Sequence, residues 1–87
     1  MKNNNITSKN MEMYSLRDRI VGTYGDIILS HNIDDAKRRV AYSLQSNPYR
    51  DDLELFALGF YCLDNGCVDP FEKPVFICNV SELYSEA

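Results

Sequence analysis

The chain has 87 residues, of which 45% are apolar and 11% aromatic, and its net charge is −4. This length allows one domain with a thin core, and the apolar content is too high for a disordered chain. An acidic total argues against a general nucleic-acid coat protein, which needs many phosphate contacts.

Charge is distributed unevenly along the chain. Residues 1–50 hold eight Lys and Arg residues against five acids, whereas residues 51–87 hold one Lys against eight acids. This asymmetry leaves room for one local basic face, and it also suits head-to-tail association or a basic partner. An ordinary solvated surface explains it as well.

The N-terminal segment is polar and rich in Asn, so we predict a flexible tail over residues 1–10 and a single domain over residues 11–87. The segment lacks the apolar stretch of a secretory signal, and no apolar run approaches the roughly 20 residues of a membrane span. The three cysteines are an odd number, which is typical of free thiols in a reducing cytoplasm. We therefore expect a cytoplasmic protein without membrane contact.

Two strands are predicted first. In residues 12–18, Tyr14 and Leu16 share one face while Arg17 falls on the other, which is the alternation of a short strand. Gly22 and Gly25 mark a turn region. Residues 26–30 then form a second strand, antiparallel to the first because the connection is short.

An amphipathic helix is predicted after Asn32, a good N-cap residue that is followed by two acids in the first turn. Apolar residues recur along one stripe with the helical period, namely Ile33, Ala36, Val40 and Leu44. The helix should end at Asn47-Pro48, because the residue before a proline avoids helical angles.

The last part of the chain predicts two more strands. Residues 53–63 are the most apolar stretch and indicate a long central strand, in which Gly59 suggests a bulge or a close approach of another backbone. Asn65-Gly66 favours a two-residue type I′ turn that pairs Asp64 with Cys67. The returning strand should be cut short at Pro70, and a last strand should follow over residues 75–80.

The predicted fold class is therefore α+β, with a small antiparallel sheet of about four strands and one helix packed on one sheet face, in ββαββ order. A thin core and a long apolar strand leave apolar surface or a sheet edge exposed in a single copy. We therefore expect a homodimer or a higher homo-oligomer.

No pattern points to catalysis, so we expect no enzyme, no metal and no cofactor. His31 has no nucleophile placed for it by sequence. The cysteines lack the C-x2-C spacing of a zinc site and are better explained as small buried hydrophobes. A Cys62–Cys67 disulfide would need those residues directly opposite each other, which a two-residue turn does not provide.

One basic surface is a candidate for nucleic-acid binding. Tyr42 follows Arg38 by one helical turn, so cations can meet phosphates while an aromatic ring stacks on a base. The candidate residues are Arg17, Arg19, Lys37, Arg38, Arg39 and Tyr42. An ordinary solvated helix face, with Lys37 extended along the edge of the buried stripe, is the alternative.

Several short segments occur in a fairly specific order. They are MYSLRD at residues 13–18, Asn32 followed by Ala36 and Arg38, DLELFALGFYCLDNG at residues 52–66, and Pro74-Val75. In these segments the chain resembles the small nonstructural protein of gokushoviruses, which are microviruses with single-stranded DNA. The resemblance carries no catalytic residues.

The resemblance implies a phage nonstructural accessory protein that acts by binding in the host bacterial cytoplasm. Such a protein would assist the switch from viral DNA replication to single-stranded genome synthesis and packaging. Its partners would be the viral replication or packaging machinery, single-stranded DNA, or both. The alternative is a host-directed inhibitor or adaptor that binds a bacterial protein through its acidic surface.

Overall fold

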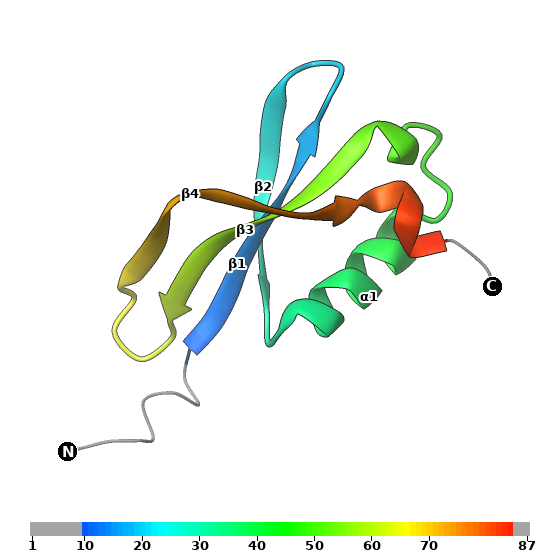
Figure 1. The fold of residues 1–87 in the computed structure, drawn as a ribbon. Coiled ribbons are helices and arrows are strands. Elements are labelled where there is room, and N and C mark those ends of the chain that lie inside the picture. The colour runs from blue at the N-terminus through cyan, green and yellow to red at the C-terminus, as the bar shows by residue number, and fades with distance from the viewer. Residues whose placement is uncertain (1–9, 85–87) are drawn as a thin grey trace.

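The computed structural model describes residues 10–84, which form one antiparallel sheet and one helix (Figure 1). The strands are β1 (Asn10–Asp18), β2 (Thr23–Ser30), β3 (Leu53–Cys62) and β4 (Val68–Asn79), and the helix α1 (Ile33–Leu44) lies between β2 and β3 in the sequence. The strand order is β2-β1-β3-β4, so β3 is central as predicted. The predicted α+β class and ββαββ order are confirmed.

Two short 3₁₀ turns complete the fold, η2 (Arg50–Asp52) before β3 and η3 (Val80–Tyr84) after β4. Val80, which we expected at the end of the last strand, belongs to η3 and is fully buried. Residues 1–9 of the expected tail lie outside the described residues. Asn10, which we also assigned to the tail, begins β1 instead, where it pairs with Cys62.

The core lies between α1 and one face of the sheet (Figure 1). Its buried members come from all parts of the chain and are Tyr14, Ala36, Val40, Leu55, Cys78 and Val80. The predicted helix stripe is thus buried at its centre, and Leu44 is half-buried. Ile33 differs from the prediction, because it lies in the first helical turn and remains 37% exposed.

The start of α1 follows the sequence signal. The side-chain oxygen of Asn32 accepts a hydrogen bond from the backbone N–H of Asp35 at 2.8 Å. This bond satisfies one of the N–H groups that a helix leaves unpaired at its start.

Gly59 marks the point where β4 crosses close to β3. Its φ is +145°, and a Cβ atom built on it would lie 2.4 Å from the backbone oxygen of Asp69. The pairing of β3 also shifts by one residue beside Gly59, between Met13 and Tyr14 of β1. The sequence-based expectation of a bulge or a close backbone approach is confirmed.

The turn between β3 and β4 differs from the prediction. The Cys62 N–H donates to the Cys67 oxygen at 2.9 Å, so these two cysteines face each other across a four-residue loop, residues 63–66. The Asn65 side chain accepts from the Cys67 N–H at 2.9 Å, and Gly66 has a φ of +77°. Asn and Gly therefore act as turn residues, but in a longer loop than a type I′ turn.

We expected the returning strand to stop at Pro70. Strand β4 instead continues through Pro70 and Pro74 to Asn79. It lies at an edge of the sheet, where a residue without an N–H group is tolerated. Its pairing with β3 also jumps from Pro70 to Val75, so the intervening residues have no ladder partner.

Candidate functional site

The helix α1 holds four of the six predicted site residues, of which Lys37 is half-buried beside the core stripe. We call Lys37, Arg38, Arg39 and Tyr42 the basic helix surface. The Arg38 side chain is 79% exposed and Tyr42 is 75% exposed. Their spacing of one helical turn places them on the side of α1 that faces away from the sheet.

Asp35 holds both arginines of this surface. An Arg38 nitrogen donates to the Asp35 carboxylate at 2.8 Å, and the Arg39 guanidinium lies 3.9 Å from its other oxygen. The Ser30 hydroxyl donates to Asp35 at 2.6 Å. These contacts, led by the Ser30 hydrogen bond, lower the pKa of the Asp35 carboxyl to about 2. The two arginines therefore stand beside a fixed negative charge.

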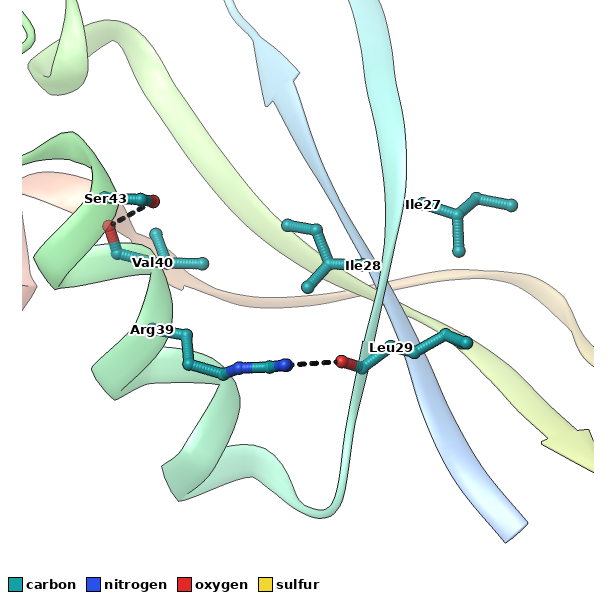
Figure 2. Close-up of a pocket in the computed structure, with 6 residues that line it drawn as sticks. All are labelled: Ile27, Ile28, Leu29, Arg39, Val40 and Ser43. Carbon is teal, nitrogen blue, oxygen red and sulfur yellow. Dashed lines mark hydrogen bonds between the residues drawn. The ribbon is translucent and has the colours of Figure 1, made fainter. Parts of the chain in front are cut away.

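Arg39 also has a structural contact that the sequence did not reveal. Its guanidinium donates to the Leu29 carbonyl at 2.7 Å (Figure 2). Leu29 belongs to β2, which is an edge strand, so this bond satisfies a carbonyl at the rim of the sheet. Arg38 and Tyr42 have no such tie to the sheet among the described contacts.

A groove of about 490 Å³ lies between α1 and β2 (Figure 2). Ile28 turns toward α1 in this view, and Val40 and Ser43 line the helix side. Arg39 is the charged group of the lining, and it is already engaged by Leu29 and Asp35. The groove thus offers apolar contact and no acid–base pair.

Arg17 and Arg19 are not brought to the basic helix surface. Arg17 shares the sheet face away from α1 with Ser15 and forms an ion pair with Glu54 at 3.4 Å. Arg19 follows β1, where it donates to the Asp51 carbonyl at 2.8 Å. The predicted set of six residues is therefore divided between the helix and the far end of the sheet.

The sheet face away from α1 carries an apolar surface that our site prediction missed. Strand alternation and pairing place on it Arg17 and Glu54 at one end and a larger set of mostly apolar side chains: Met11, Met13, Ser15, Tyr24, Ile27, Leu29, Phe56, Tyr61, Val68 and Phe76. We call this set the open face. Figure 2 shows Ile27 and Leu29 turned away from the helix. The signal was present in the sequence, because the strands are apolar on both faces while a single helix covers only one.

Aromatic rings form a row across one end of the open face. The ring centroids of Tyr24 and Phe56 lie 5.4 Å apart, and those of Phe56 and Phe76 lie 5.6 Å apart, both edge to face. At the other end, Met13, Ile27, Leu29, Tyr61 and Val68 line a shallow depression. The face is thus aromatic at one end and largely aliphatic at the other.

Two titratable groups of the core, Tyr14 and Cys78, favour their neutral forms. Burial raises the pKa of the Tyr14 phenol, whose O–H donates to Glu12, and burial raises the pKa of the Cys78 thiol. Cys62 and Cys67 lie at the surface end of the β3–β4 loop as free thiols. Among residues 10–84, no group of three or more His, Cys, Asp or Glu side chains is placed to hold a metal ion.

The fold makes this chain a small α+β protein with a helix on one face of a four-stranded sheet. A family model described as Phage ORF5 protein matches residues 11–83. The chain belongs to this phage protein family. No curated protein and no solved structure matched it. In the part of the chain that the structure describes, no helix has the length and apolar character needed to cross a membrane.

Proposed function

We propose that this protein is a gokushovirus-type nonstructural accessory protein that acts by binding in the host bacterial cytoplasm. In this proposal it assists the switch from viral DNA replication to single-stranded genome synthesis and packaging, and it contacts single-stranded DNA. The observation that supports the DNA contact is the pairing of exposed Arg38 and exposed Tyr42 on the outward side of α1.

The chemistry of this surface favours a single strand over a duplex. A single strand offers unstacked bases on which Tyr42 can stack, and base–aromatic stacking contributes about 1–3 kcal/mol per base. Arg38 supplies a cation one helical turn away for the adjoining phosphate. Its ion pair with Asp35 is exposed on the arginine side, and such pairs contribute only about 0–1 kcal/mol, so a phosphate can replace the carboxylate.

The charge around the basic helix surface sets the expected strength of binding. Asp34 and Asp35 lie on the same helix as the three cations, and the whole chain is acidic. Few phosphates are neutralised, so we expect weak binding that falls with salt along a shallow slope.

Fluorescence anisotropy with labelled single-stranded DNA at low salt tests the proposal. We expect Arg38→Ala combined with Tyr42→Ala to weaken binding by about tenfold or more, because a charge and a stacking ring are removed together. This pair is preferred to Arg39→Ala, since Arg39 also supports the rim of the sheet through Leu29.

Arg19→Ala is the matched control for this experiment. Arg19 is also a partly exposed arginine in an ion pair, with Asp52 at 3.5 Å, but its described partners lie in η2 and not in α1. We expect this control to bind like the unmodified protein. Absence of binding by the unmodified protein, or equal losses in the control and the double variant, would reject the DNA contact through α1.

A second candidate function is supported by the exposed acids near the C-terminal half. Asp51, Asp69, Glu72 and Glu82 are all exposed. A surface of this kind suits a host-directed inhibitor or adaptor that binds a bacterial protein which normally holds nucleic acid. A pull-down from infected cells with and without nuclease separates the two functions. A partner retained after nuclease treatment supports the second function, whereas a partner lost with the nucleic acid supports the first.

A further inference from the structure

The open face lies opposite the helix layer, and its outer strands are exposed while Met13 and Ser15 on the central strand β1 are buried. Ile27 of β2 is 60% exposed, and Val68 and Phe76 of β4 are 56% and 49% exposed, so apolar surface is exposed on both edge strands of the sheet. Contiguous apolar patches of this kind mark interaction sites on soluble proteins, whereas scattered apolar residues do not. An apolar sheet face is stabilised by packing against another layer, and among residues 10–84 no helix or second sheet covers this face.

Charge indicates which kind of partner fits this face. Its charged residues are Arg17 and Glu54 at one end, and they already pair with each other at 3.4 Å. The face is therefore close to neutral in a chain with a net charge of −4. A nucleic acid would find almost no free cation there. Two copies of the same face would meet without repulsion between like charges.

The size of the face fits a second copy of the chain. Four strands about 4.8 Å apart and about nine residues long at ~3.3 Å per residue present roughly 550 Å². Two such faces bury roughly 1,100 Å² in total, which reaches the area of about 1,000 Å² that a specific interface requires. Sheets also stack face to face with interdigitated side chains, as in β-sandwiches.

We infer that the protein forms a two-fold homodimer in which the open faces of two copies pack against each other. The dimer has the layer order helix, sheet, sheet, helix. A two-fold axis makes the interface self-complementary, so the same residues serve both sides. Both copies of α1 then lie on the outside, and the basic helix surface stays accessible. The inference does not rest on the proposed DNA contact, because the two surfaces lie on opposite sides of the sheet.

Sedimentation equilibrium of the unmodified protein over a wide concentration range tests the inference. We expect a species of twice the chain mass of 10.0 kDa at high micromolar concentration. Ile27→Glu should raise the dimer dissociation constant by about tenfold or more, because a charge would enter an apolar interface. Ile20→Glu is the matched control, since Ile20 is 73% exposed but lies in the β1–β2 turn, outside the open face.

A second measurement on the unmodified protein guards against a variant that fails to fold. Dilution across the dimer transition should move the amide NMR signals of Met13, Ile27, Leu29 and Phe76, while those of α1 stay in place. A single chain mass at the highest concentration would overturn the inference. So would shifts confined to α1, or equal weakening by Ile27→Glu and Ile20→Glu. A mass above two chains would also overturn it, because each copy has one open face and two such faces cover each other completely in a dimer.

Discussion

Asp35 joins the end of β2 to the first turns of α1. Its carboxylate accepts hydrogen bonds from the Ser30 hydroxyl, the His31 backbone N–H and Arg38. Since a charged carboxylate is the better acceptor, these bonds favour the ionised form and hold its pKa near 2 rather than 3.8. One side chain thus fixes the strand–helix junction and also positions the arginines of the basic helix surface.

This lowered pKa predicts a dependence of stability on acid. The stabilisation from Asp35 is fully present above the ordinary pKa of 3.8, and it is lost as the pH falls from there toward about 2. Urea denaturation at a series of pH values should therefore show a smaller loss in acid for Asp35→Asn than for the unmodified protein. Ser30→Ala should show part of the same effect, because it removes the leading hydrogen bond. Identical pH dependence in all three proteins would contradict this role.

The three thiols should differ in reactivity. Cys67 is exposed and Cys62 half-buried, whereas Cys78 is buried and burial raises its pKa. The thiolate is the reactive form, so Cys78 should be protected in the folded protein. We expect Ellman's reagent to modify two thiols rapidly and the third only after unfolding in urea. Cys78→Ala should keep the fast phase unchanged and abolish the slow one, and a single fast phase of three thiols would contradict the assignment.

At the scale of elements, β3 and β4 depend on the conformation of Gly59. A side chain there would meet the backbone of Asp69 and Pro70, at 2.4 and 2.6 Å from its Cβ, and backbone cannot move away as a flexible side chain does. The φ of +145° adds strain for any other residue. The crossing of the two strands is therefore possible only with glycine.

Gly59→Ala should destabilise the fold by roughly 3 kcal/mol or more, because backbone strain of about 1–3 kcal/mol adds to a steric clash. Gly22→Ala is the matched control. Gly22 also has a positive φ, +86°, but a Cβ atom added to it would meet no other atom within 4 Å. It should cost about 1 kcal/mol from strain alone. Urea denaturation of both variants measures the difference, and equal losses would show that the close approach is unimportant.

The elements that were predicted well are those with local signals. The capping residue Asn32 and the stripe through Ala36 and Val40 lie within one helix, so sequence spacing was sufficient for α1. The predicted length of the β3–β4 loop was wrong although its contacts are local, because Asn65 and Gly66 serve as turn residues in a four-residue loop as well as in a two-residue one. The predicted course of β4 was wrong because it depends on the position of β4 in the sheet and on its pairing with β3. Pro70 was read as a strand terminator, but an edge position removes the need for its N–H.

For the candidate site, too, the sequence predicted what depends on local spacing and missed what depends on distant partners. Helical spacing correctly placed Arg38 and Tyr42 outward, since that depends only on the helix. It could not reveal that Arg17 is engaged by Glu54, 37 residues away in sequence. The open face was foreseen only as unspecified exposed apolar surface, because its residues come together through the register of four strands.

At the scale of the whole molecule, the two exposed surfaces lie on opposite sides of one sheet. The basic helix surface is polar and carries cations beside acids, whereas the open face is apolar and nearly neutral. These chemistries suit different partners, so we propose a nucleic acid for one and a second copy for the other. Because the sheet separates them, a substitution on one side should leave binding on the other unchanged.

The close approach at Gly59 also limits which single-base substitutions the codon for residue 59 can tolerate. A single-base change in any glycine codon that alters the amino acid introduces a residue with a Cβ atom. At Gly59 each of those residues would place that atom against the backbone of Asp69 and Pro70. Every single-base change that replaces Gly59 should therefore be selected against. Only synonymous changes should persist in this codon, unless strand β4 shifts at the same time.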